Sequence, residues 1–296
     1  MAGLAEMKPN FRAAVAVLIA SLLGPVCAYA GQAGNQRIDP ITLVKRAVEN
    51  EAHAANDNTY YMYRTRKETA KGTELKQYIE TTQGTVGRVI AYNDKPLDSA
   101  QQQAEDARLA GICNDPRELA KKRQSQKQDS DRVTRMVRTL PDAFLYDFVS
   151  KEMAPNGHEI VKLNFRPNPN FDPPSREQQV FTGMNGTMLI DTTAERIAEI
   201  NGTLFRDVGF GWGILGHLDK GGRFIVTQAD VGDGHWQTVR TTLNFTGRAL
   251  FFHMINIKST ETSSDFHRLP NNLTFTQGVE LSKKQVATMA ENHGTK

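Results

Sequence analysis

Histidine and acidic side chains, which often carry catalysis or bind metal ions, are spread thinly along this sequence. The seven histidines are His53, His158, His217, His235, His253, His267 and His293. None lies in a His-Glu-x-x-His motif or at another recognised metal-ligand spacing. Asp265 and His267 could share a ligand on one strand face, but two residues alone do not make a metal site. The sequence therefore predicts no catalytic residue, no cofactor and no metal site.

Nucleophilic catalysis has no local signature in the sequence either. The chain contains no Gly-x-Ser-x-Gly motif. Cys113 is the one cysteine outside the N-terminal segment, so it forms no internal disulfide, and we interpret it as a partly buried residue on a helix. A hydrolase without local motifs remains an alternative, because antiparallel β enzymes often lack them.

The segment Gly209–Gly213 has the spaced glycines of a nucleotide-binding loop. A dinucleotide site needs a long helix directly after the glycines, whereas Gly221 and Gly222 soon interrupt this segment. We interpret it as an aromatic loop between two strands. Its apolar residues are the candidate contacts for a ligand or partner: Phe210, Trp212, Ile214 and Leu215.

The first thirty residues have the pattern of a secretory signal peptide. A charged start at Lys8–Arg12 precedes an apolar run at Ala13–Leu23, and Ala28–Ala30 supplies the small-x-small cleavage pattern. The run is shorter than the ~20 residues that a membrane-spanning helix needs. We expect cleavage after about Ala30 and a periplasmic or secreted protein that is soluble after cleavage.

Two alternatives at this end would keep the protein on a membrane. One is a retained anchor, if cleavage fails. The other is lipidation of Cys27, which the preceding Val26 and Gly24 disfavour because a lipidated cysteine normally follows a small residue and has leucine three positions before it. Export, with a formal net charge of only +3, argues against a nucleic-acid binder.

The chain after the leader begins with one helix and a β meander. Asp39-Pro40 suits a helix start, and Ile41, Val44, Val48 and Ala52 follow at helical spacing. The predicted strands of this half are Thr59–Thr69, Leu75–Thr82 and Val86–Tyr92.

A helical insert is predicted at about 98–140, as two helices at Ser99–Gly111 and Pro116–Arg138. The second helix is rich in lysine and arginine. Its basic side chains form either a solvated helix face or a patch for anionic lipid or an acidic partner.

The second half of the chain is predicted to be almost entirely β. Its expected strands are Ala143–Glu152, His158–Arg166, Gly186–Asp191, Arg196–Val208, Gly222–Val231, Trp236–Phe245 and Ala249–Lys258. We expect a turn at Thr246-Gly247, a strand-end turn at Asp191, and a C-terminal helix from Leu281.

These elements predict a mainly β fold with helices (α+β). We expect a large curved antiparallel sheet, or a half-open β-barrel, covered by helices, since the apolar face of so wide a sheet must be shielded from water. The predicted organisation is a signal peptide at 1–30, one domain at 31–278 and a C-terminal helix or tail at 279–296. An apolar concavity would lie between sheet and helices.

The order of elements resembles the outer-membrane lipoprotein-sorting (LolA/LolB-like) family of bacterial envelope proteins. The resemblance rests on the turn at Tyr92–Leu97, the strand Gly186–Asp191, the strand after it at Arg196–Phe205, and Leu250–Phe252. It covers about Ile41–Thr262 and implies a half-open barrel with a helical lid that binds acyl chains. It assigns no individual ligand residue, and the long basic insert departs from the family.

Location and architecture together predict an envelope protein that binds or carries a lipid, a lipoprotein or another apolar ligand in the concave face of the sheet. The alternative is a structural or sensor protein that binds another envelope protein through its sheet edge or its basic helices. Neither function involves a nucleic acid, and peripheral membrane contact is left open.

Overall fold

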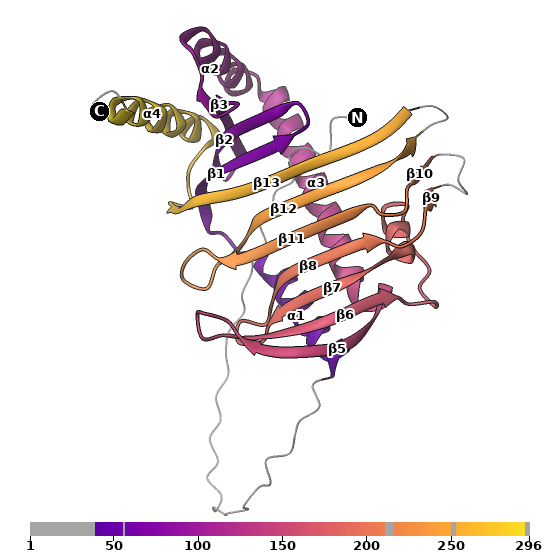
Figure 1. The fold of residues 1–296 in the computed structure, drawn as a ribbon. Helices are drawn as coiled ribbons and strands as arrows, with labels where there is room; N and C mark the ends of the chain where they lie inside the picture. The colour runs from indigo at the N-terminus through magenta and orange to yellow at the C-terminus, as the bar shows by residue number, and fades with distance from the viewer. Residues whose placement is uncertain (1–38, 56, 211–215, 250–252, 294–296) are drawn as a thin grey trace, which may run out of the picture.

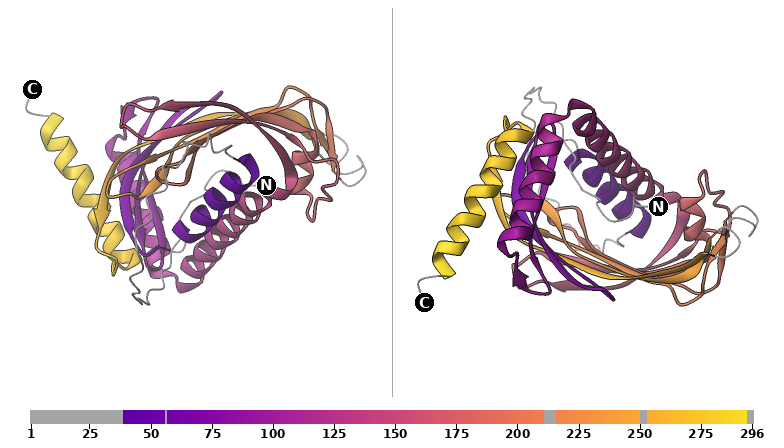
Figure 2. Two further views of the ribbon diagram at one scale, coloured as in Figure 1. Left: turned by 90° about the horizontal axis from the view of Figure 1, so that it is seen from below. Right: turned by 90° about the horizontal axis from the view of Figure 1, so that it is seen from above.

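A thirteen-stranded antiparallel sheet dominates the molecule (Figure 1). The computed structural model describes residues 39–55, 57–210, 216–249 and 253–293. The sheet curves around two helices, and its edge strands, β4 and β5, do not pair with each other in this part of the chain (Figure 2). The predicted class, a mainly β fold with helices and a large curved antiparallel sheet, is confirmed.

The path across the sheet is β4-β3-β2-β1-β13-β12-β11-β8-β7-β6-β5, with β10 pairing β12 and β9. In chain order the strands are β1 Tyr60–Thr69, β2 Gly72–Thr81, β3 Gly84–Tyr92, β4 Lys95–Pro96, β5 Phe144–Met153, β6 Glu159–Pro167, β7 Met184–Asp191, β8 Arg196–Leu204, β9 Val208–Phe210, β10 Gly216–Leu218, β11 Arg223–Asp230, β12 Trp236–Ala249 and β13 His253–Leu269.

The helices begin close to their predicted starts in the first half of the chain. They are α1 Pro40–Ala54, α2 Ser99–Asn114, α3 Pro116–Ala143, the 3₁₀ helix η1 Glu177–Gly183 and α4 Phe275–His293. Asp98 and Gln101 form a capping box at α2, and the Asp115 carboxylate accepts hydrogen bonds from two backbone amides at the start of α3. No helix in the described ranges is long and apolar enough to cross a membrane.

The larger core lies between the concave face of the sheet and the helices α1 and α3. The amphipathic α1 buries Leu43, Val44, Ala47 and Val48 against β5, β7 and β8. The sheet contributes apolar side chains at every second position, among them Val161, Leu163, Phe165, Met188 and Ile190. Both views of Figure 2 show α1 inside the curve with α3 alongside it.

A smaller core joins α4 and α2 to β2 and β3. Phe275, Val279, Ile79 and Val86 are almost completely buried there, together with Leu109 of α2. The prediction that the tail helix starts at residue 281 is wrong, and the predicted domain boundary after residue 278 falls inside α4. Buried Phe275 and Val279 fix the first turns of this helix on the sheet, which short-range sequence signals do not reveal.

The N-terminal meander and the C-terminal strand are neighbours in the sheet. β13 pairs with β1 along nine residue positions. Tyr63 stacks on Tyr78 of β2 at 5.3 Å and on Phe266 of β13 at 5.0 Å between ring centroids. The second half of β13 is rich in serine and threonine, so its apolar pattern is too weak to predict the strand beyond Lys258.

The predicted turn at Thr246-Gly247 is wrong, because β12 continues through both residues to Ala249. Gly247 pairs with both Leu218 of β10 and Ile255 of β13. A Cβ atom at Gly247 would lie 2.1 Å from the carbonyl oxygen of His217. Glycine is therefore required at this position by a close backbone approach and not by a turn.

The predicted strand Arg196–Val208 is wrong as one element, because it divides into β8 and β9 around residues 205–207. The predicted leader at 1–30 and Leu250–Phe252 lie outside the described residues.

Replacing Phe275 by alanine tests the attachment of α4. Phe275 is fully buried, so the Phe275→Ala variant should lower the free energy of unfolding by about 3–5 kcal/mol. Thr276, its exposed neighbour on the same helix, is the control, and Thr276→Ala should change stability by less than about 0.5 kcal/mol. Equal effects in urea unfolding would contradict the packing of α4 described here.

Candidate functional site

A strip of apolar side chains crosses the concave face of β11, β12 and β13. Phe224 and Phe245 pack against the larger core, which places them on the side of α1. Strand alternation and register place four more apolar residues on the same face. We call this group the concave strip: Phe224, Val226, Leu243, Phe245, Ile255 and Ile257.

The concave strip is half-buried, and the opposite face of the same strands is mostly polar, with Ile225 and the exposed Met254 as its apolar residues. All six of its side chains have intermediate exposure. The positions between them on β12 and β13 point to the convex face and include exposed polar residues: Asn244, Thr246, Arg248, Asn256 and Lys258. The contrast identifies the concave face of these strands as an apolar surface that is still partly accessible.

The helices of the described chain cover the neighbouring part of the sheet instead of the concave strip. α1 packs on β5, β7 and β8, while α3 packs on α1, β3 and β5. None of the principal helix-to-sheet contacts within the described ranges involves β11, β12 or β13. The concave strip thus continues the larger core beyond the edge of its helical cover.

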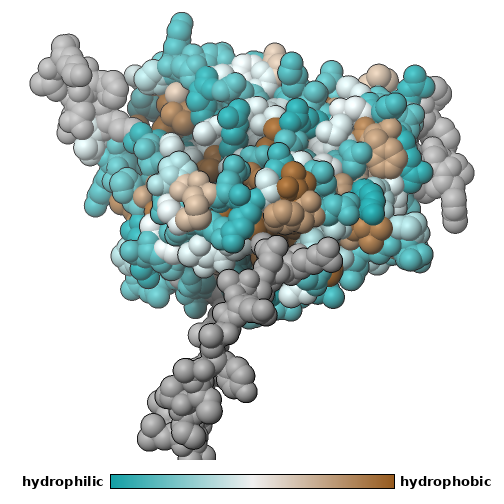
Figure 3. Space-filling model, turned by 60° about the horizontal axis from the view of Figure 1, so that its bottom comes forward, coloured by the Kyte–Doolittle hydropathy of each residue, from teal (hydrophilic) through white to brown (hydrophobic). Residues whose placement is uncertain are grey.

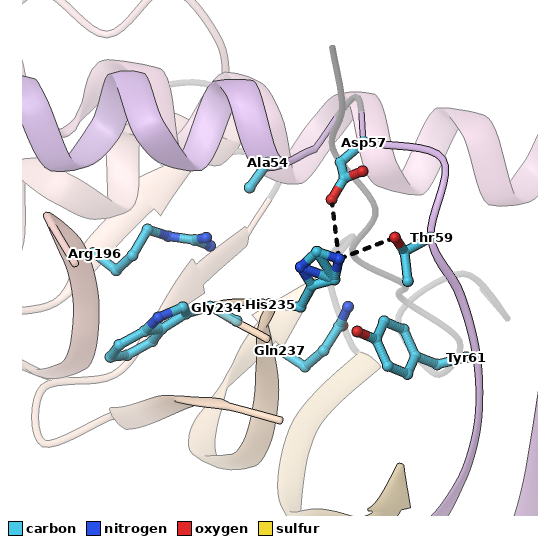
Figure 4. Close-up of a pocket in the computed structure, with 9 residues that line it drawn as sticks. Ala54, Asp57, Thr59, Tyr61, Arg196, Gly234, His235 and Gln237 are labelled. Atoms are coloured by element: carbon cyan, nitrogen blue, oxygen red, sulfur yellow. Dashed lines mark hydrogen bonds and ion pairs between the residues drawn. The ribbon is translucent and has the colours of Figure 1, made fainter. Parts of the chain in front are cut away.

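A polar pocket lies where the C-terminal half of α1 meets the strand ends (Figure 4). It consists of a cavity of about 90 Å³ and an adjoining one of about 350 Å³, which share Arg196, Gly234 and Trp236. Gln228 of β11 donates to Glu51 of α1, so this pocket is on the same side of the sheet as the concave strip. We call it the rim pocket.

Arg196, which lines the rim pocket, forms a bidentate ion pair with Glu51 of α1. Arg196 Nε and Nη2 donate to the two carboxylate oxygens of Glu51, both at 2.9 Å. The two side chains are only 9% and 13% exposed. The guanidinium carbon also lies 5.9 Å from the centre of the Trp236 ring. This bidentate pair fixes the last turns of α1 to β8.

His235 joins the connection after α1 to the turn between β11 and β12. Its Nε2 lies 3.0 Å from Thr59 Oγ1 and 3.7 Å from an Asp57 carboxylate oxygen (Figure 4). Tyr61 packs edge-on against the imidazole, and burial raises the pKa of the Tyr61 hydroxyl, which therefore stays protonated at neutral pH. A catalytic triad places its acid and its nucleophile on opposite ring nitrogens, unlike this arrangement.

A second histidine, His158, lines the larger cavity of the rim pocket. Its Nδ1 lies 2.7 Å from a carboxylate oxygen of the buried Asp191, whose other oxygen accepts from the amides of Thr193 and Ala194. Asp191 therefore occupies a strand-end turn, as predicted. In the part of the chain that the structure describes, no serine, threonine or cysteine side chain is hydrogen-bonded to His158.

The chemistry available in the rim pocket is hydrogen bonding and charge pairing. Across the described ranges, no three histidine, cysteine or acidic side chains are grouped to hold a metal ion. The pocket offers donors and acceptors beside two aromatic rings, Tyr61 and Trp236. Such a mixture orients the polar end of a ligand whose apolar part lies on a neighbouring surface.

The contact residues predicted from the glycine-rich segment are only partly placed by the structure. Phe210, the last residue of β9, is half-buried and packs against the larger core. Trp212, Ile214 and Leu215 lie outside the described residues. The prediction that this group contacts a ligand or partner remains a prediction.

The rim pocket escaped sequence reasoning because its residues are far apart in the chain. Glu51 and Arg196 are 145 positions apart, and Thr59 and His235 are 176 apart. The one local signal for the rim pocket was the polar stretch that ends α1, and such a stretch is equally typical of an ordinary helix end. For the concave strip, the usable signal was the alternation of Leu243 and Phe245 on β12.

Comparisons with protein-family models, with curated proteins and with solved structures found no match.

The Glu51→Ala variant tests the attachment of α1. It leaves the nearly buried Arg196 without its carboxylate partner, so it should lower the free energy of unfolding by about 3 kcal/mol. Glu49→Ala removes the same charge from an exposed position of the same helix and should change stability by less than about 0.5 kcal/mol. Thermal or urea unfolding measures both variants. Similar losses of stability would contradict the conclusion that the Glu51–Arg196 pair attaches α1 to the sheet.

Proposed function

We propose that this chain is an exported envelope protein that binds or carries a lipid, a lipoprotein acyl chain or another apolar ligand against the concave face of its sheet. The observation that carries the proposal is the concave strip. Six apolar side chains on neighbouring strands are only half-buried, beside a completely buried core. A soluble protein rarely leaves such a continuous surface partly accessible unless it binds something there.

The energetics of the proposal follow from apolar burial. Each methylene group that leaves water for such a surface contributes about 0.8 kcal/mol, so an acyl chain gains affinity with length. The rim pocket supports the same proposal, because ligand sites combine a mostly apolar lining with a few polar groups that fix orientation. The acyl chain would lie along the concave strip with its polar end toward Arg196 and Trp236.

The proposed location and ancestry rest on the sequence. The leader pattern supports export to the periplasm or beyond, and the resemblance to the LolA/LolB-like family supports a role in handling acyl chains. A curved, unclosed sheet with helices inside the curve fits that resemblance. It is the architecture expected of a half-open barrel that holds an apolar ligand.

A second candidate function is protein binding through the edge strand β5. Four exposed apolar residues lie on this strand: Leu145, Phe148, Val149 and Met153. The other edge, β4, has only Lys95 and Pro96, which discourage further pairing. Figure 3 brings the β5 end forward and shows apolar side chains among polar ones. In-cell cross-linking from Phe148 to one protein, with no bound lipid, would favour this function.

Leu243→Arg tests the ligand proposal. Leu243 lies on the concave strip, so an arginine there places a charge where the acyl chain binds and should weaken binding of a fluorescent fatty acid at least tenfold. The matched control is Asn244→Arg, which adds the same side chain to the exposed convex face of the next position. Fluorescence titration gives both dissociation constants, and circular dichroism confirms that both variants fold.

Two results would contradict the proposal. One is the absence of saturable fatty-acid binding to the unmodified protein. The other is equal weakening of binding by Leu243→Arg and Asn244→Arg, which would place the ligand elsewhere.

A further inference from the structure

Helix α3 carries a row of exposed basic side chains. We call it the basic stripe: Arg117, Lys121, Arg123, Lys127, Arg135 and Arg138. All six are exposed, although this helix also packs against α1, β3 and β5. The stripe therefore belongs to the face of α3 that points away from the body of the protein.

Helical geometry gathers these side chains on one surface. At 3.6 residues per turn they fall within an arc of about 160°, and Arg117 and Arg138 are about 32 Å apart along the axis. The opposite arc carries the residues that face the protein, including Leu119, Met136, Val137 and Leu140. The stripe is thus long and broad, and it is separate from the packed face.

Acidic residues compensate only part of this charge. Lys127 pairs with Asp131 at 2.6 Å and Lys121 with Glu118 at 3.5 Å. In three arginines of the stripe the guanidinium group has no hydrogen-bond or ion-pair partner among the described residues: Arg117, Arg123 and Arg138. A concentrated positive surface remains on a chain whose formal net charge is only +3.

The position of α3 determines which side of the molecule the basic stripe faces. Figure 2 shows α3 beside α1 at the open side of the curved sheet. The stripe lies on the part of α3 turned away from α1 and the sheet. A surface that binds the stripe would therefore meet the open side of the concave face.

We propose that the basic stripe docks this protein on an anionic lipid surface. Its exposed arc contains no aromatic or large aliphatic residue, whereas a specific protein interface normally centres on such anchors. Basic side chains on one helix face are attracted to the negative potential of anionic headgroups. The predicted export of the chain disfavours a nucleic acid as the partner.

Docking goes beyond ligand binding and does not depend on it. It would turn the open side of the sheet toward the lipid layer from which an apolar ligand is taken or to which it is delivered. The attraction is electrostatic, so it should weaken as salt shortens the range of the interaction.

Co-sedimentation with lipid vesicles tests the proposal. The experiment uses the chain without its predicted leader (residues 31–296) and no added fatty acid. We expect binding to phosphatidylglycerol-containing vesicles at low salt, little binding to pure phosphatidylcholine vesicles, and release by 0.5 M sodium chloride. In the variant Arg117→Glu/Arg123→Glu/Arg138→Glu, binding should fall about 100-fold or more, because each basic residue near an anionic surface contributes roughly fivefold.

Two matched variants distinguish docking from a general charge effect. Arg240→Glu/Arg248→Glu/Lys258→Glu makes the same charge change on exposed convex positions and should retain most vesicle binding. The lysine variant Arg117→Lys/Arg123→Lys/Arg138→Lys should bind nearly as well as the unmodified chain. The proposal is overturned if the unmodified chain ignores anionic vesicles, if it binds phosphatidylcholine equally well, or if the convex variant loses as much binding as the stripe variant.

Discussion

The apolar concave face of one very wide sheet is the constraint on which this molecule depends. An open antiparallel sheet buries that face only where something packs on it. Here α1 fills the curve over β5, β7 and β8, and the larger core forms between them. The cover ends before β11, β12 and β13, whose concave side chains stay half-buried. The proposed ligand site is therefore the part of this face that the protein's own helices leave uncovered.

The position of α1 determines both the core and the proposed site. Its apolar face builds the core, while Glu51 in its last turn accepts hydrogen bonds from Arg196 of β8 and Gln228 of β11. The connection that follows is held to the β11–β12 turn through Thr59 and His235. These polar contacts fix how far the cover extends over the sheet. Arg196, Thr59 and His235 also line the rim pocket, so side chains that hold α1 and its connection in place would also orient the polar end of a ligand.

Local patterns in the sequence predict most helices and strands, but they do not predict the order of the strands across the sheet. Pro40 and Pro116 mark helix starts because proline suits the first turn of a helix, and the Asp115 carboxylate caps α3, whereas the Asp39 side chain makes no capping hydrogen bond. Gly247 misled because a glycine needed for close backbone contact looks the same in sequence as a turn glycine. The β1–β13 pairing and the Glu51–Arg196 contact join segments that no short-range pattern connects. The alternation of Leu243 and Phe245 pointed to one strand of the concave strip, whereas its other strands and the rim pocket required the fold.

Photo-cross-linking with a diazirine-bearing fatty acid would locate the ligand on the protein. The bound probe labels the side chains it touches, and mass spectrometry of the digested protein locates them. We expect labelling concentrated on Phe224, Leu243, Phe245 and Ile257, with little on the alternate residues Asn244, Thr246 and Lys258 of the convex face. Labelling that is equal on the two faces, or confined to the β5 edge, would contradict ligand binding on the concave strip.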